Sequence, residues 1–386
     1  MIKVARIKRN LNNVAFPRLS GTEFELEAFN KVREEIKSLN LKYEIQNFTY
    51  SSFYSRIYPK IAFLSVSLIY LTLYFTSFVI LSLIIVSILF GLVISTVILT
   101  RKPEKIQFKP KFNSQNLLVK INSLSDNLKN RDRILLFISH LDSKGQRFMI
   151  KTRIRVIKLW TYTSIILTVI FILKFLINLG FEMIIHILGF FPLILNIFAS
   201  IMIVLNTTDN SSNGAIDNAS GIVCNLEMLN YYSIPENRLE NYNMWFLFTG
   251  AEECGTMGIR HFYNNLENFD PSKSIVFDFE SITSFNVLFR GGKEADYTRD
   301  INKLILNNNR GLWIKNNTTK RIFGAHSDGG FLGDRGIQGY GIGGAGATAY
   351  MHSTNDTIDK VNTAILKRLC LVLTDALKEH DSIFFK

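Results

Sequence analysis

Residues 244–255 read MWFLFTGAEECG, and this stretch decides how the chain is organised. Five apolar residues in a row are typical of a strand buried on both faces, as in parallel sheets. Two adjacent carboxylates, Glu252 and Glu253, follow this strand. Burying two carboxylates costs free energy unless a positive charge compensates them. A metal ion would supply that charge, with one glutamate as its ligand and the other as a general base.

Two more apolar runs indicate strands of the same kind, Arg133–Ser139 (RILLFIS) and Ser274–Phe279 (SIVFDF). Helical patterns cover about residues 22–39, 221–230 and 361–379. This alternation predicts an α/β fold with a mostly parallel central sheet flanked by helices. Functional side chains in such sheets gather at the carboxyl ends of the strands.

Polar residues stand where these strands end. His140 ends the first run, and Asp142 lies two positions on, where it can hydrogen-bond the ring nitrogen that a metal does not use. By itself this pair is more typical of a surface loop. Asp278 and Glu280 also lie two positions apart, so they share one face of their strand.

Two further candidates come from loops. Asp217 opens an apparent helix among small residues, where helix capping is the simpler interpretation. His352 lies in the polar loop MHSTNDT at residues 351–357. Two histidines and three carboxylates suit zinc, with manganese or cobalt as alternatives. Five ligands exceed the three usual at one catalytic zinc, which predicts a two-metal site with one bridging carboxylate.

Residues 61–100 contain no charged side chain. One membrane crossing needs about 20 apolar residues, so these 40 positions predict a hairpin of two transmembrane helices. A second apolar stretch, 159–205, is interrupted near Lys174 and Glu182 and predicts another hairpin. Four crossings leave residues 1–60, 101–158 and 206–386 on one side, where they can form one domain. Buried core helices of a soluble protein are the alternative interpretation.

Charge and cysteine content narrow the class of protein. Lys and Arg number 44 and Asp and Glu 32, a net charge of +12, and many of the cations flank the apolar stretches. That placement is typical of a membrane protein rather than one that binds nucleic acid, and it favours a cytoplasmic domain. A basic surface exposed all round is the alternative, and the triplets at Asn47 and Asn206 match glycosylation acceptor sites, which would favour the outside. Three cysteines without CxxC spacing exclude a disulfide scaffold and a zinc ribbon.

Six segments, in this order, resemble the M28 family of zinc metallopeptidases. They are FPRLSGTEFE (16–25), HLD (140–142), DNASG (217–221), GAEECG (250–255), Ser327-Asp328 with Phe331 and Gly336-Ile337, and HSTNDTID (352–359). The resemblance implies a zinc-exopeptidase-like fold in which 1–60, 101–158 and 206–386 form the peptidase domain. The hairpins 61–100 and 159–205 are insertions in it.

The resemblance also implies the roles of individual residues. Asp217 would bridge two zinc ions, His140 and a fourth-position carboxylate would complete one site, and Glu253 and His352 would complete the other. In the segment FDFESI, Glu280 aligns best with that fourth position, and Asp278 is its rival.

Glu252 is then expected to act as general base and acid, and Asp142 to orient His140. The activity that the resemblance implies is a two-zinc aminopeptidase acting on peptides. The apolar stretches and their flanking cations, rather than the resemblance, predict a membrane-embedded, multi-pass protein with its peptidase domain on the cytoplasmic side. A glutaminyl-cyclase-like enzyme with a single zinc and a non-catalytic scaffold of the same fold are the alternatives. The complete set of candidate ligands and the intact Glu252 argue against both.

Overall fold

The computed structural model describes residues 1–75, 102–124, 133–176, 182–266, 269–283, 287–291, 296–316, 327–344 and 346–384, with residues 84, 87, 88, 91, 94 and 95. The chain divides into two compact units. The first comprises residues 1–50, 112–145 and 209–386, and the second comprises residues 51–111 and 146–208. The five-segment division expected from hydropathy stays a prediction.

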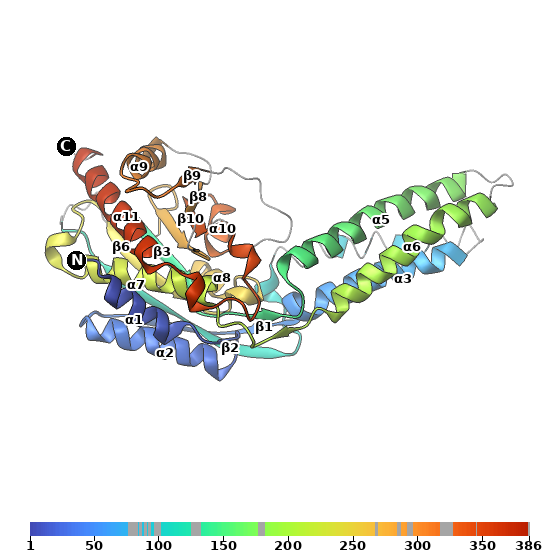
Figure 1. Ribbon diagram of the computed structural model, residues 1–386, viewed down its shortest axis with the longest axis horizontal. Helices are drawn as coiled ribbons and strands as arrows, with labels where there is room; N and C mark the ends of the chain where they lie inside the picture. The colour runs from blue at the N-terminus through green and yellow to red at the C-terminus, as the bar shows by residue number, and fades with distance from the viewer. Residues whose placement is uncertain are drawn as a thin grey trace. The chain divides into compact units, whose positions relative to one another are not determined.

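The first unit is built on an eight-stranded sheet (Figure 1). In spatial order its strands are β1 (Glu44–Ser51), β2 (Lys111–Ile121), β6 (Asn243–Thr249), β3 (Ile134–His140), β7 (Ile275–Phe279), β10 (Gln338–Gly344), β8 (Val287–Gly291) and β9 (Ile314–Asn316). β3 pairs in parallel with β6 and β7, β7 with β10, and β8 with β9. β2–β6 and β8–β10 are antiparallel. This confirms the predicted α/β fold with a mostly parallel sheet.

Helices cover both faces of this sheet. The helices α1 (Val4–Val14), α2 (Glu23–Ser38), α7 (Ser220–Tyr232), α9 (Asp296–Asn307) and α11 (Thr363–Phe384) contribute to the larger core. The smaller core of the other face includes α8 (Met257–Asn264) and α10 (Asp328–Gly333). The three predicted helices match α2, α7 and α11 in position. A separate two-stranded sheet joins β4 (Gly145–Gln146) and β5 (Thr208–Asp209).

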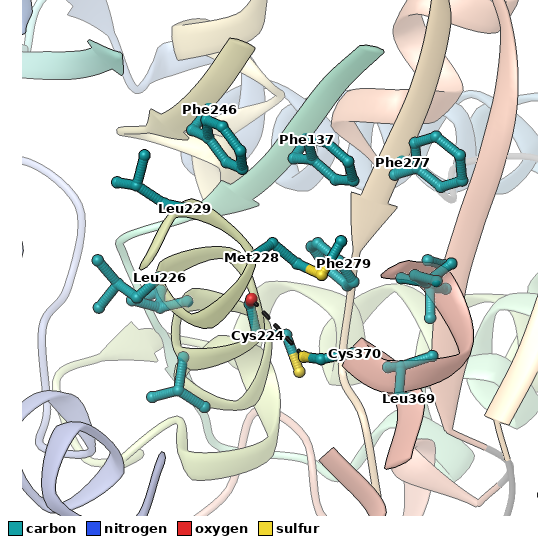
Figure 2. Close-up of a cluster of buried hydrophobic side chains, with 14 of the residues drawn as sticks. Phe137, Cys224, Leu226, Met228, Leu229, Phe246, Phe277, Phe279, Leu369 and Cys370 are labelled. Atoms are coloured by element: carbon teal, nitrogen blue, oxygen red, sulfur yellow. Dashed lines mark hydrogen bonds between the residues drawn. The ribbon is translucent and has the colours of Figure 1, made fainter. Parts of the chain in front are cut away.

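The larger core shows why the apolar runs form central strands. All seven residues of β3 are buried, as are all five of β7. Figure 2 shows Phe137 of β3 between Phe246 and Phe277 of the neighbouring strands, with α7 and α11 packed below them. The ring centroids of Phe137 lie 5.1 Å and 5.2 Å from those of Phe246 and Phe277. Residues from three distant parts of the sequence therefore form one aromatic layer that fixes the strands beside one another.

The second unit contains three long apolar helices: α3 (Tyr58–Phe75), α5 (Ile150–Leu176) and α6 (Glu182–Leu205). The described spans that are long and apolar enough to cross a membrane are Phe53–Phe75, Ile150–Lys174 and Met183–Leu205. The second hairpin is thus present as two such helices. Of the first predicted hairpin, one helix is described, α3. The second was expected within residues 76–101, most of which lie outside the described residues. Two single turns, Phe53–Ile57 and Pro103–Lys105, flank the first apolar stretch.

Polar side chains join the three helices inside this unit. Asn196 of α6 is fully buried, and its amide donates to the hydroxyls of Thr163 and Ser164 on α5, at 2.9 Å each. Its carbonyl oxygen accepts from the hydroxyl of Ser67 on α3 at 2.5 Å. Such hydrogen bonds hold helices together in lipid, where the hydrophobic effect does not drive their association.

Candidate metal centre

The candidate site lies where the central strands of the first unit end. His140 is the last residue of β3 and stands opposite Thr249 of β6. In the same sheet Ile138 stands opposite Asp278 of β7, and His140 and Glu280 each lie two positions further along their chains. Parallel pairing therefore brings the three polar strand ends to one edge of the sheet, as the sequence predicted.

Asp217 lies between two histidines. Its Oδ1 is 3.2 Å from Nε2 of His140, and its Oδ2 is 3.1 Å from Nε2 of His352. Nε2 of His352 also lies 3.0 Å from Oε1 of Glu253. Each oxygen of Asp217 thus faces a different histidine, which is the arrangement that a bridging carboxylate requires.

The donor atoms fit zinc in chemistry and spacing. Asp217, Glu253 and His352 each offer one nitrogen or oxygen, and these atoms lie within 4.8 Å of one another. Zinc binds such atoms at about 2.0–2.1 Å in a tetrahedron, which sets neighbouring donors roughly 3.3 Å apart. The separations of 3.0–3.2 Å that join His352 to Glu253 and Asp217 to the two histidines are close to that spacing.

The carboxylates surround the histidines closely enough to control their protonation. Burial opposes the charge on His140, but the contacts with Asp142 and Asp217 outweigh it and hold the His140 pKa well above its usual value. Burial likewise opposes ionisation of Glu253, but His352 and Lys144 outweigh it and lower the Glu253 pKa to about 2.

Asp142 contacts both His140 and the turn that carries the two glutamates. Nδ1 of His140 lies 3.0 Å from the main-chain oxygen of Asp142 and 3.3 Å from its Oδ1. The carboxylate also accepts from the backbone N–H groups of Glu252 at 3.1 Å and Glu253 at 3.0 Å, and from the hydroxyl of Ser20. The predicted contact with His140 is present. Asp142 also holds the backbone of the turn that carries Glu252 and Glu253.

Glu252 lies inside this turn with 7% of its surface exposed. Burial raises its pKa well above the usual value. The charge of His140 opposes this shift, and the charges of Glu280, Glu253 and Asp328 add to it. Glu252 is therefore one of several buried carboxylates whose charges act on one another at this edge of the sheet.

The two candidates for the fourth position differ in their surroundings. Asp278 is 1% exposed, and its Oδ2 accepts a hydrogen bond from the N–H of Gly329 at the start of α10. Glu280 directly follows β7 and faces the site. Burial and the charges of Asp278 and Asp217 raise its pKa, while that of His140 lowers it. Asp278 thus has a main-chain partner at α10, and the choice of Glu280 over Asp278 as the fourth ligand stays a prediction.

Three non-glycine residues at the site adopt left-handed backbone angles. Ala251, just before Glu252, has φ 52°; Ser281, just after Glu280, has φ 52°; His352 itself has φ 58°. Such angles are uncommon outside glycine and cluster where function fixes the backbone. The hydroxyl of Ser281 donates to Oδ1 of Asp217 at 3.1 Å.

Several supporting residues were missed by the sequence argument. Arg18 is fully buried and donates to the carbonyl oxygens of Leu141 at 2.6 Å, Asn213 at 2.7 Å and Gly214 at 2.9 Å. It therefore ties the loop of His140 to the loop of Asp217. Burial lowers the Arg18 pKa to about 10. Its position inside the first family segment was the only sign in the sequence.

Glu25 and Asp356 also bind the backbone of loops at the site, but they accept hydrogen bonds from N–H groups where Arg18 donates to carbonyl oxygens. Glu25 accepts from the N–H of Ala251 at 2.8 Å, and burial raises its pKa to about 8. Asp356 accepts from the N–H groups of Ile216 at 2.6 Å and Asp217 at 3.2 Å. Both residues lie within segments that resemble the family, but a carboxylate that binds main-chain N–H groups has no spacing signature.

A known family profile matches the part of the chain that contains Asp217, Glu253 and His352. Residues 197–376 match the profile of Peptidase family M28. No curated protein sequence matches the chain.

Solved structures share the fold at low identity. An aminopeptidase from Aneurinibacillus sp. strain AM-1 has a TM-score of 0.59 at 13% identity, over 98% of this chain and 94% of that one. BSAP, a zinc aminopeptidase from Bacillus subtilis, has a TM-score of 0.56 at 13% identity, and the match covers 98% of this chain and 95% of that one. A glutaminyl cyclase from Macrostomum lignano has a TM-score of 0.55 at 9% identity, and the match covers 100% of this chain and 90% of that one. The profile match over residues 197–376 confirms the resemblance to peptidase family M28 that the six segments in family order predicted.

Proposed function

We propose that this protein is a membrane-embedded M28 aminopeptidase that works with two zinc ions. The observation that carries the proposal is the position of Asp217, whose two oxygens face His140 at 3.2 Å and His352 at 3.1 Å. A carboxylate shared in this way suits a bridge between two metal ions. Solved zinc aminopeptidases with the same fold support the substrate class.

Five side chains would hold the two ions. His140 and Glu280 would complete one site, and Glu253 and His352 the other, with Asp217 shared between them. When bound, zinc would supply Lewis acidity that polarises a peptide carbonyl and makes water more acidic.

The remaining chemistry falls to Glu252. Its carboxylate would take a proton from the attacking water as the water oxygen bonds to the carbonyl carbon. The carbon–nitrogen bond then breaks, and Glu252 returns the proton to the departing amine. Asp142 would keep Glu252 in place through the two N–H groups of the turn. The free amine of the substrate would bind near the surrounding carboxylates.

Metal content and amino-acyl hydrolysis together test this function. The detergent-purified protein is expected to contain about two zinc ions per chain by elemental analysis. It should hydrolyse amino-acyl reporter substrates but not their N-acetylated counterparts, since an aminopeptidase needs a free amine. Absence of bound metal together with no metal-restored hydrolysis would make it a non-catalytic scaffold instead.

A glutaminyl cyclase is the second candidate, because one observation favours it. Asp217, Glu253 and His352 form a compact three-residue group, and three protein ligands are usual at one catalytic zinc. A peptide with N-terminal glutamine separates the two activities by mass spectrometry. Cyclisation removes ammonia and keeps the residue, whereas an aminopeptidase removes the residue.

We also propose a multi-pass topology, with four transmembrane helices in two hairpins and the peptidase domain on the cytoplasmic side. The three described apolar spans and the cations beside them support it. Peptides and the lipid bilayer would then be the partners, with no role for nucleic acid. All three native cysteines are buried, so an exposed Lys37→Cys variant gives a clean label site. A membrane-impermeant maleimide should label it only after the cells are lysed.

A further inference from the structure

A lysine lies against one of the proposed ligands. Nζ of Lys144 is 2.5 Å from Oε2 of Glu253, while Oε1 of the same carboxylate lies 3.0 Å from Nε2 of His352. The Lys144 side chain is 15% exposed and that of Glu253 is 5% exposed. The two oxygens of Glu253 thus have different neighbours. Oε2 faces the ammonium of Lys144, and Oε1 faces His352 of the proposed metal site.

The backbone around Lys144 is firmly held. The N–H of the preceding Ser143 donates to the carbonyl of buried Arg18 at 3.0 Å, and its hydroxyl donates to that of Ser212 at 3.1 Å. The following Gly145 packs so closely against the side chains of Asp209 and Ser211 that a Cβ there would overlap them. The Lys144 side chain therefore starts from a fixed point beside Glu253, and its 15% exposure distinguishes it from most surface lysines.

We propose that Lys144 is a positioning residue that holds Oε2 of Glu253, so that Glu253 presents Oε1 alone to the metal shared with His352 and Asp217. This inference rests on the proposed metal-dependent function. A glutamate with both oxygens free can rotate or bind a metal through both of them. Holding one oxygen fixes the ligand count and leaves a coordination position open for substrate.

Two effects of the ammonium on metal affinity oppose each other. The positive charge of Lys144 repels a bound metal ion, but the Glu253 carboxylate lies between the ammonium and the metal and offsets that repulsion. The hydrogen bond from Lys144 orients Glu253 as a metal ligand, and removing such partners typically weakens metal binding about 10–100-fold. We expect orientation to dominate because Glu253 is nearly buried and Lys144 is anchored on both sides.

The experiment compares metal binding in the full-length, detergent-purified protein and its variants. Lys144→Met removes the donor, and Lys144→Arg keeps a cationic donor. Lys120→Met is the matched control, because it removes the 2.9 Å ion pair of Lys120 with Glu44, away from the site. Zinc affinity is measured by competition with a chromophoric chelator. The visible spectrum of the cobalt-loaded protein reports coordination number independently of activity.

Lys144→Met should bind zinc about 10–100-fold more weakly at one site. Its cobalt spectrum should weaken, as expected when a fifth ligand atom is added. Lys144→Arg should restore most of the affinity, and Lys120→Met should match the wild type. Unchanged or tighter zinc binding by Lys144→Met with an unchanged cobalt spectrum would overturn this inference alone. A wild-type protein that binds no metal would overturn the proposed function and this inference together.

Discussion

The backbone N–H of Glu253 donates to Oδ2 of Asp142 at 3.0 Å, across 111 positions of sequence. The neighbouring N–H of Glu252 donates to the other oxygen of Asp142 at 3.1 Å. One buried carboxylate therefore joins the loop after β3 to the turn after β6. Since these strands are neighbours in the sheet, the contact fixes His140 and the two glutamates as one group.

Replacing Asp142 by alanine should destabilise the peptidase domain and loosen the metal group together. The change leaves two buried N–H groups without this acceptor, at a cost of about 1–3 kcal/mol for each. Denaturant unfolding followed by tryptophan fluorescence measures the loss. Asp142→Asn keeps one acceptor oxygen and should lose less. An alanine variant as stable as the wild type, with full metal content, would contradict this role.

Glu252→Gln should abolish turnover while keeping the metal. It removes the group assigned to proton transfer, whose contribution is typically about 10²–10⁴-fold in rate. Glu253→Gln should lose metal as well, because Oε1 of Glu253 faces His352 at 3.0 Å. Elemental analysis and amino-acyl hydrolysis are measured on both variants. If both keep their metal fully and lose activity equally, the division of roles is wrong.

The strand ends were predictable from sequence for a specific physical reason. Near-continuous apolar runs at 133–139 and 244–248 are typical of strands buried on both faces of a sheet, and the charged residues after them are then expected at its edge. Parallel strands end at the same edge of a sheet, so the sequence could place His140 and Glu252 at one edge. It could not give the order of the strands, and His140 lies close to the turn of Glu252 because β3 is the direct neighbour of β6.

Other features could not be read from the sequence. Lys144 looks like an ordinary loop lysine, because only folding brings it to Glu253. Arg18 binds main-chain carbonyls, which carry no side-chain signature, and a fully buried arginine is rare. The choice between Asp278 and Glu280 stayed open because both share one face, and only the contact with Gly329 distinguishes them.

Glu280→Ala should weaken metal binding more than Asp278→Ala does. Asp278 accepts the N–H of Gly329 at 2.8 Å, so its loss should mainly destabilise the start of α10. Glu280 lies two positions further on, just beyond the end of β7, where the charge of His140 acts on it. Zinc competition and thermal unfolding on both variants separate the two effects. A greater loss of zinc affinity in Asp278→Ala would move the ligand to Asp278.

His380 should make the peptidase domain less stable in mild acid. Its ring is buried on α11, with Nδ1 3.4 Å from Oη of Tyr242. Burial lowers the pKa of His380 to about 4, with Asp300 opposing the shift and Arg133 adding to it. An unfolded histidine titrates near 6.5, so the unfolded chain binds more protons between about pH 4 and 6.5. Stability is therefore lost as the pH falls through that range.

The measurement for His380 is the free energy of unfolding from pH 7 to pH 5 in the wild type and in His380→Gln. Glutamine cannot take up the proton, so the variant should lose less stability over this range. Its absolute stability at pH 7 is irrelevant to the comparison, because only the slope with pH is compared. Identical slopes would show that His380 titrates normally in the folded protein.

The helix bundle offers a test that is independent of the metal site. The Asn196 amide donates to Thr163 and Ser164 at 2.9 Å, and its carbonyl accepts from Ser67 at 2.5 Å, so one side chain links α3, α5 and α6. Hydrogen bonds in membrane proteins average about 0.6 kcal/mol each. Asn196→Leu keeps the volume and removes all of them, so it should destabilise the bundle by on the order of 2 kcal/mol. Thermal unfolding in detergent, followed by circular dichroism, measures the change.

The control is Thr161→Val, which removes an exposed hydroxyl that, among the described residues, donates within α5 to the carbonyl of Ile157. It should leave the melting temperature almost unchanged, because that bond joins no second helix. If Asn196→Leu also melts like the wild type, apolar packing around Leu167 and Phe171 holds the helices without the polar contacts. If it melts earlier while its zinc content stays full, the bundle and the metal centre are stabilised separately.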